Sequence, residues 1–479
     1  MTTMDPMEED TDMRQRREIA GGWARNVARP GLGALTALAT MVLAGCDVDS
    51  ILDVEDPDKA TVEDIQDPAN LPAVRAHAVG EFQVAYAGRG AGQDNSFILF
   101  SGLLGDEYEA SGTFPTRVEV DRRNIDVANS TTQTTFRLMH RARIAAQRSA
   151  EAFGEHEPGT RPHAEAHVLA GFMYNAFGEM YCSGVPFSEL PPGESPVYGD
   201  PLPTDEIFQE AASWFSEGAS LATGAGAENE VHAAAIGQAR ALLNLGQYDQ
   251  AAALVTDVPT DYSFQIFHDG ATGRQWNGMW NFINNVQRWR IPDRAGGNGL
   301  PYRSDGTEVD PSGNIIEEGD PRIVWFHDGV GFDTSVEQFS QMKYPTRETP
   351  TPVATGIEAR LIEAEAALNQ GDQATFLAIH NDLRATEGLE PFTDEEAAGL
   401  GHDGLVDLHF KERAYWLWQT GHRLGDLRRL IRQYDRDSEE VFPSGTYHKG
   451  GGFGSDVNFP IPIDEENNPS FNTCLNRDA

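Results

Sequence analysis

The feature that most constrains this chain is a helical hairpin rich in small residues, at residues 233–255. Ile236, Ala239 and Leu243 recur at helical spacing before a turn at Gly246, and helical spacing resumes after it. Small residues let two helices approach closely, as in the tetratricopeptide repeat, although this turn is one residue shorter than that repeat's usual pattern. Such a hairpin cannot bury its apolar face alone, so it predicts a body of stacked helices.

Further amphipathic segments form two blocks. The first block covers about residues 132–258 and includes helices expected at 136–153, 164–181 and 207–221. The second covers about residues 355–432, with helices expected at 356–384 and 405–432. Between them, residues 259–351 are rich in Gly, Pro, Asn and aromatic residues and lack sustained helical periodicity. We therefore expect a mainly α fold, in which a loop-rich insertion on a helical scaffold carries the binding side.

The beginning of the chain has the pattern of a lipoprotein signal peptide, over residues 1–45. A lead with several arginines precedes an apolar run at 31–44 that is too short to span a bilayer comfortably. The run ends in Leu43-Ala44-Gly45-Cys46, which looks like a bacterial lipobox and makes Cys46 the predicted lipid-attachment residue. An ordinary secretory signal with a chance cysteine, or a twin-arginine signal at Arg16-Arg17, are the alternatives.

A tether and one large domain are expected after this leader. Residues 46–75 are acidic and contain several prolines and few helix signals, as a tether between lipid and body would. Residues 76–479 are expected to form a single domain. Two further cysteines, Cys182 and Cys474, are expected in an oxidising compartment. A bond between them would close a very long loop and stabilise the fold by roughly 4 kcal/mol or more, whereas two separate buried thiols are the alternative.

The charge balance excludes one class of partner. The chain has 36 Lys and Arg residues against 75 Asp and Glu residues, a formal net charge of −39. Such a surface repels polyanions, so no nucleic acid partner is expected.

Three patterns in the sequence bear on whether the protein is an enzyme or holds a cofactor. His163 and His167 are four residues apart, but the glutamate of a zinc protease would directly follow the first histidine, so both are expected to be surface histidines. The glycine-rich stretch at 88–92 lacks the flanking strand and helix of a phosphate loop and indicates a turn. The acidic run at 305–320 lacks calcium-loop spacing, and loose calcium binding stays open. We predict no cofactor, no metal site and no catalytic residue.

Ligand-binding candidates lie in the loop-rich insertion. Aromatic side chains there alternate with amides and an arginine, which suits a sugar because indole rings stack on its C–H faces while polar groups bind its hydroxyls. The candidates are Arg274, Trp276, Asn277, Trp280 and Trp289. The alternative is that these tryptophans pack into the body. A second candidate region is the acidic stretch 106–109 with Phe114.

Several short motifs occur in one order along the chain and together resemble the SusD/RagB family of nutrient-uptake lipoproteins. They are Gly184-Val185-Pro186, Asp320-Pro321-Arg322, Glu358-Ala359-Arg360-Leu361 with Glu363-Ala364-Glu365-Ala366, Gly371-Asp372, Leu383-Arg384, Glu412-Arg413, Leu417, Gly421-His422-Arg423, Asp426-Leu427-Arg428-Arg429 and Phe459-Pro460-Ile461-Pro462 with Glu466 and Asn468-Pro469. Two positions that usually hold glutamate in the C-terminal signature hold Trp416 and Thr420 here. The local ion-pair network is therefore expected to differ.

This resemblance implies a SusD-like fold with tetratricopeptide-like hairpins, and a role in nutrient uptake without catalysis. It implies a lipid-anchored position in the outer membrane, facing the cell exterior, above a SusC-like TonB-dependent transporter that the protein covers as a lid. The ligand would be an oligosaccharide, favoured by family habit, or another oligomeric nutrient such as a peptide. An anchored hydrolase and a helical-repeat scaffold that binds only proteins are the remaining alternatives.

Overall fold

The computed structural model describes residues 67–90, 95–189, 191, 195–471 and 473–479. The predicted signal peptide, Cys46 and most of the predicted tether lie outside these residues. Contacts group these described residues into one unit. Its first long helix, α3, begins at Leu71, so the last residues assigned to the tether belong to a helix instead. None of the helices in the described part of the chain is both long and apolar enough to cross a membrane.

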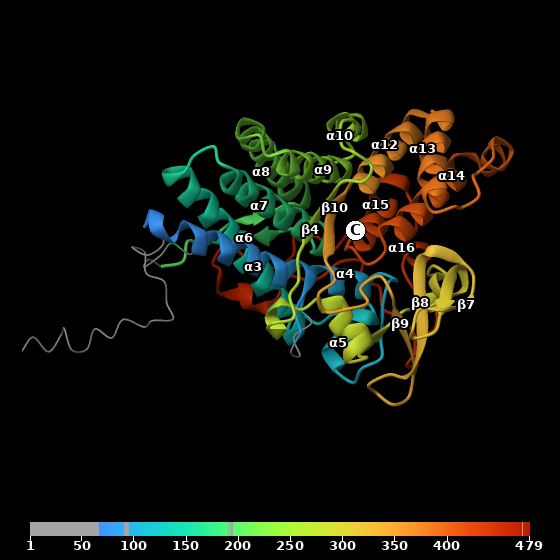
Figure 1. The fold of residues 1–479 in the computed structure, drawn as a ribbon. Coiled ribbons are helices and arrows are strands. Elements are labelled where there is room, and N and C mark those ends of the chain that lie inside the picture. Colours follow the sequence, from blue (N-terminus) through green and yellow to red (C-terminus); the bar gives the residue numbers. More distant parts are fainter. Residues whose placement is uncertain (1–66, 91–94, 190, 192–194, 472) are drawn as a thin grey trace, which may run out of the picture. The chain divides into compact units, whose positions relative to one another are not determined.

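The first helical block is a series of helices that pack on their neighbours in sequence (Figure 1). Its members are α3 (Leu71–Ala87), α4 (Phe97–Leu104), α5 (Pro115–Asp121), α6 (Ser130–His156), α7 (Arg161–Met180), α8 (Thr204–Ala225), α9 (Glu228–Asn244) and α10 (Tyr248–Val255). Small residues set the spacing of three of them, because Gly171 of α7 and Gly237 of α9 both face the ring of Phe215 on α8. A Cβ atom at position 237 would lie 2.3 Å from that ring, so the close approach requires glycine.

The second block continues the stack, since α10 packs against α12 (Gly356–Gln370). Gly371 ends α12 at φ 74°, and the side chain of Asp372 caps α13 (Gln373–Thr386) by accepting from the Thr375 N–H. The segment expected as one helix at 405–432 is two helices, α14 (Asp394–Trp416) and α15 (Arg423–Tyr434), joined by a short turn. A short α16 (Ser438–Val441) follows.

The insertion between the blocks contains more regular structure than its composition indicated. A sheet of strand order β7-β6-β8-β9 forms from β6 (Gly306–Val309), β7 (Ile315–Glu317), β8 (Asp320–Val330) and β9 (Glu337–Gln341). β6 runs parallel to β8, whereas β7 and β9 are antiparallel to their neighbours. Figure 1 shows these strands in yellow and orange, apart from the stacked hairpins. The absence of helical periodicity was correctly predicted, but the sheet was missed.

Short two-stranded pairings connect the insertion to the helical body. β4 (Ser263–Ile266) pairs with β10 (Thr351–Thr355), and β5 (Trp289–Arg290) pairs with β1 (Glu109–Ala110) of the first block. A third pair joins β2 (Val185–Pro186) to β3 (Pro201–Leu202). Between β4 and β6 the chain forms short helical turns, at η2 (Gly273–Gln275), η3 (Trp280–Asn285), η4 (Ala295–Gly297) and α11 (Tyr302–Asp305). Two further turns are η1 (Pro68–Asn70) and η5 (Ile463–Asn467). The mainly α fold predicted from the sequence is confirmed.

A disulfide bond fastens the end of the chain to this body. Cys182, which follows α7, is bonded to Cys474, and their Cα atoms are 6.0 Å apart. The Cys182 N–H also donates to the carbonyl of Phe459. Cys182 therefore contacts the C-terminal segment at two places, through this hydrogen bond and through the disulfide bond. Of the two alternatives for these cysteines, the structure has the bonded pair.

Replacing both Cys182 and Cys474 with serine should destabilise the protein, because the bond joins residues separated by 292 positions. The chain-entropy model gives about 6 kcal/mol for a loop of this length. The measurement is chemical denaturation of the oxidised protein, the reduced protein and the double variant. The last two should agree with each other, and an equal unfolding free energy in all three would contradict a stabilising role.

Candidate functional site

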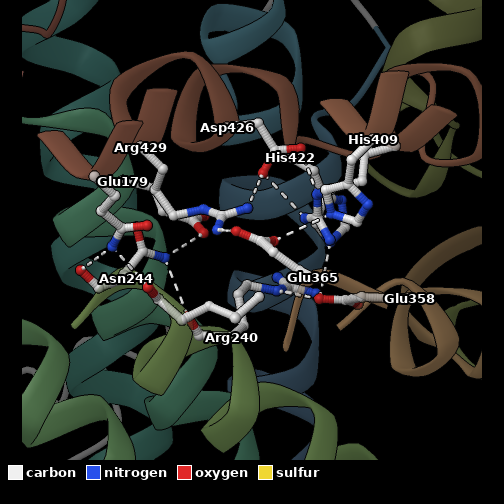
Figure 2. Close-up of polar contacts among 12 residues, drawn as sticks. Glu179, Arg240, Asn244, Glu358, Glu365, His409, His422, Asp426 and Arg429 are labelled. Atoms are coloured by element: carbon white, nitrogen blue, oxygen red, sulfur yellow. Dashed lines mark hydrogen bonds and ion pairs between the residues drawn. The ribbon is translucent and has the colours of Figure 1, made fainter. Parts of the chain in front are cut away.

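The charged residues of the C-terminal motif lie inside the protein (Figure 2). Asp426 of α15 accepts hydrogen bonds from Arg413 at 2.9 Å and from Arg429 at 2.8 Å. Arg429 also pairs with Glu365 of α12, whose other oxygen lies 3.3 Å from His409 Nε2. All five side chains are almost completely buried. These residues therefore join α12, α14 and α15 and do not form a ligand site.

A second buried ion pair extends this network to α9. Arg240 donates to both oxygens of Glu358, at 2.7 and 2.8 Å, and His422 Nε2 lies 3.2 Å from the same carboxylate. Burial alone would raise the pKa of Glu358, but the charge of Arg240 and the contact with His422 outweigh it and lower that pKa. Glu358 is therefore ionised at neutral pH. Figure 2 shows Arg240 and Glu358 beside the Glu365–Arg429 pair.

The two departures from the family's C-terminal signature are accommodated without new charges. Trp416 lies beneath the guanidinium of Arg322, 4.9 Å from its carbon, and Thr420 donates to the carbonyl of Leu417. Arg322 in turn forms ion pairs with Asp320 and Glu412. Of the two carboxylates that hold Arg322, Asp320 lies on the same strand, β8, and Glu412 lies on α14.

Two of the predicted ligand contacts are wrong, because the structure places them inside. Trp289 is fully buried and packs edge-on against Phe100, with ring centroids 5.3 Å apart. Asn277 is also buried, and its amide donates to the Thr349 carbonyl at 2.9 Å. Its side-chain oxygen accepts from the Trp280 N–H at 2.9 Å, so Asn277 positions the loop that carries Trp280.

The other three candidates lie nearer the surface. Trp276 and Trp280 are half-buried and perpendicular to each other, with centroids 5.9 Å apart. Trp276 packs closely on Gly90, where a Cβ atom would lie 2.3 Å from its ring, and the Arg347 guanidinium lies 5.2 Å from the ring centroid. Arg274 is exposed and forms an ion pair with Glu81 at 2.9 Å. A ligand-binding role for these three residues stays a prediction.

An exposed aromatic platform was only partly visible in the sequence. Phe114 and Phe332 are 48 % and 47 % exposed, and the Arg288 guanidinium lies 5.2 and 3.6 Å from their respective ring centroids. Arg117 lies 4.4 Å from the Phe114 ring. We call these four residues the Phe114–Phe332 platform. The sequence indicates Phe114, together with the 106–109 stretch, as a candidate, whereas no local sequence signal connects Arg288 and Phe332 with it.

Backbone hydrogen bonds hold the platform's loops together. The Ser111 N–H donates to the Arg288 carbonyl at 2.8 Å, and the Phe332 N–H donates to the Gln287 carbonyl at 2.9 Å. The Asp333 N–H donates to the Ser111 carbonyl at 2.9 Å, which closes the arrangement. Two exposed rings with stacked guanidinium groups are therefore fixed in place, as a preformed surface for planar or ring-shaped ligands requires.

The acidic stretch 106–109 is internal, which corrects its assignment as a ligand site. Asp106 forms a bidentate ion pair with Arg423 at 2.6 and 2.9 Å, so it ties this loop to α15. Glu109 pairs with Arg290. Glu107 is completely buried and accepts from the Gln419 N–H at 2.6 Å, while its other oxygen has no hydrogen-bond partner among the described residues. Burial raises the pKa of Glu107 to about 8.

The histidine pair is also buried, contrary to the expected surface position. His163 and His167 pack ring against ring at 4.9 Å, and His163 Nδ1 accepts from the Gly159 N–H. In the part of the chain that the structure describes, no group of three or more His, Cys, Asp and Glu side chains could hold a metal ion.

The raised pKa of Glu107 predicts a pH-dependent contribution to stability. The folded protein keeps the proton up to about pH 8, whereas the unfolded chain loses it near the ordinary value of 4.5. The contribution is therefore complete below about pH 4.5 and is lost as pH rises through about 8. The unfolding free energy of the wild type minus that of Glu107→Gln should fall with a slope approaching about 1.4 kcal/mol per pH unit in this window. A difference that does not change with pH would contradict the assignment.

Comparisons with known proteins support the fold that the motifs implied. No family model and no curated protein matches the sequence. Solved structures match the fold of this chain. One is a SusD-like carbohydrate-binding protein from Bacteroides fragilis NCTC 9343, with 16% identity, a TM-score of 0.60, and coverage of 84% of this chain and 98% of that one. A SusD superfamily protein from Parabacteroides distasonis ATCC 8503 has 13% identity, a TM-score of 0.60, and coverage of 87% and 100%. Surface glycan-binding protein A from Bacteroides uniformis has 13% identity, a TM-score of 0.58, and coverage of 85% and 99%. The chain has a SusD-like fold.

Proposed function

We propose that the protein is a lipid-anchored, glycan-binding protein of the outer membrane that delivers oligosaccharides to a SusC-like TonB-dependent transporter. The observation that carries this proposal is the SusD-like fold, which extends over nearly the whole length of solved structures described as carbohydrate-binding. The leader that ends in Cys46 supports the anchor. Peptides and other oligomeric nutrients are the alternative ligands.

The Phe114–Phe332 platform supplies the chemistry that a glycan requires. A pyranose ring presents an apolar C–H face, which gains contact on an exposed aromatic ring that is already rigid. The Arg288 guanidinium lies 3.6 Å from the Phe332 ring centroid and brings a positive charge to the same surface. Trp276, Trp280 and Arg274 belong to the same insertion as Arg288 and Phe332. We assign the ligand to this loop-rich side.

Oligosaccharide binding should depend on the two exposed rings of the platform. In the detergent-solubilised full chain, Phe114→Ala with Phe332→Ala should weaken binding at least tenfold, because removing stacked rings costs about 1–3 kcal/mol. Trp276→Ala tests the Trp276 loop, which contains the other exposed and half-buried candidates. Binding is measured by calorimetry against panels of oligosaccharides and peptides, and the sugars are recovered afterwards to check for cleavage.

Tyr198→Ala is the matched control, because Tyr198 is 47 % exposed and should be dispensable. Binding of peptides but not of oligosaccharides would show that the ligand is a peptide. Glycan binding that is unchanged by the platform substitutions and by Trp276→Ala would contradict the assignment of the ligand to these loops. Cleaved sugars would favour the anchored hydrolase.

Anchoring and partnership should depend on Cys46. The wild-type protein should fractionate with the outer membrane and copurify with a large β-barrel protein, whereas Cys46→Ser should lose the lipid and leave the membrane fraction. Mass spectrometry of the N-terminal peptide measures the lipid directly. A Cys46→Ser protein that remains membrane-bound to the same extent would contradict the anchor.

A further inference from the structure

A separate pocket lies where the insertion meets the second helical block. Its volume is about 280 Å³, and it lies among the residues before and within β4, β10, the start of α12 and the turn between α14 and α15. None of its lining residues belongs to the Phe114–Phe332 platform or to the Trp276 loop. The volume is below the usual range for drug-sized ligands, so the pocket fits a compact molecule of about one ring.

Aromatic and aliphatic side chains form one part of the pocket's lining. Trp416 and Tyr262 supply rings, and Val353 and Ile357 supply aliphatic surface. The indole N–H of Trp416 is buried and has no acceptor among the described residues. Buried polar atoms of this kind normally have a partner, so a ligand oxygen near Trp416 would satisfy an otherwise costly donor.

One cation, Lys343, lies in this lining. Its ammonium group donates to the carbonyl of Trp418, which uses one of its three donors. Desolvation lowers the pKa of Lys343 to about 8, although Glu107 opposes the shift. The other charged groups of the floor compensate each other, because Glu358 is held by Arg240 and His422. Lys343 is therefore the group in this pocket that is suited to hold an anion.

The rim carries small hydroxyl and amide groups. Ser263 and Gln265 of β4 line it together with Thr260, Asp261 and Thr355. The Gln265 amide donates to Ser263 at 3.0 Å, so these two side chains form a polar edge. Asp261 is exposed at the same edge and would repel a second negative charge.

We propose that this pocket is a second binding site, which takes a hexuronic acid, a single sugar ring with one carboxylate. The carboxylate would pair with the Lys343 ammonium, the ring face would contact Trp416, and the hydroxyls would meet the polar edge at Ser263 and Gln265. A neutral sugar would forgo the charge-assisted bond to Lys343. A dianionic phosphate would have one cation to pair with and would be repelled by Asp261, so we expect it to bind less well than a uronate.

Calorimetry of the detergent-solubilised full chain with galacturonate, glucuronate, galactose, glucose and acetate tests this proposal. The two uronates should bind at least tenfold more tightly than the neutral sugars and than acetate, because hydrogen bonds between charged groups are the stronger ones. Lys343→Met should abolish that preference, whereas Lys411→Met, which removes an exposed lysine outside the pocket, should leave it intact. Gln265→Ala at the rim should weaken uronate binding severalfold without removing the preference.

The pH profile separates charge recognition from a loss of folding. Uronate binding should weaken as pH rises through about 8, because Lys343 loses its proton while the ligand carboxylate stays ionised. The Phe114 and Phe332 substitutions should leave the uronate site unaffected, so failure of the glycan site and failure of this pocket are distinguishable. Equal binding of uronates and neutral sugars, equal binding of acetate, or uronate binding unchanged in Lys343→Met would overturn the proposal. Absence of uronate binding at millimolar concentration would overturn it as well.

Discussion

The fold depends on a buried set of arginine–carboxylate pairs at the junction of its helical blocks. Arg240–Glu358 connects α9 to α12, and Arg429 connects α15 to Glu365 of α12 and to Asp426. Taking such charges out of water costs several kcal/mol per ion, and only complete pairing offsets that cost. Removing one partner would leave an uncompensated buried charge, typically at a cost of 3–5 kcal/mol. The network therefore penalises any arrangement in which α9, α12 and α15 do not meet.

This junction also fixes the loops that carry the proposed ligand sites. The turn that joins α14 to α15 places Gln419 at φ 57°, where its N–H meets the buried carboxyl of Glu107, and Arg423 just beyond it holds Asp106. Asp106 and Glu107 belong to the same loop segment as Ser111, which anchors Arg288 and Asp333 by backbone hydrogen bonds. A continuous series of contacts thus runs from the ion pairs of the core to the exposed rings. Preorganised rings lose little conformational entropy on binding, which favours affinity for flexible oligosaccharides.

The sequence predicted the helices better than the site, for a physical reason. Helical periodicity and capping are local, so the hairpins and the Gly371-Asp372 break could be found directly. Several strands of the insertion pair with partners that are distant in the sequence, as β5 does with β1 and β10 with β4, and the exposure of an aromatic ring depends on what packs on it. Trp289 and Phe332 illustrate the limit, because nothing within a few residues of either shows that the first is enclosed by Phe100 and Tyr108 whereas the second stacks on Arg288.

The strong negative charge of the chain determines how it could recognise an acidic sugar. A net charge of −39 repels anions at long range, but at physiological ionic strength this field is screened beyond about 8 Å. Recognition of a carboxylate must then come from a cation at contact distance in a partly desolvated place, where the Coulomb interaction is least weakened by water. Lys343 meets this condition, whereas the exposed Lys411 is already paired with Asp305. The platform has no such requirement, because ring stacking and hydroxyl hydrogen bonds do not depend on the sign of the surrounding field. On the two proposals made above, the pocket would recognise a carboxylate and the platform would recognise neutral sugar rings.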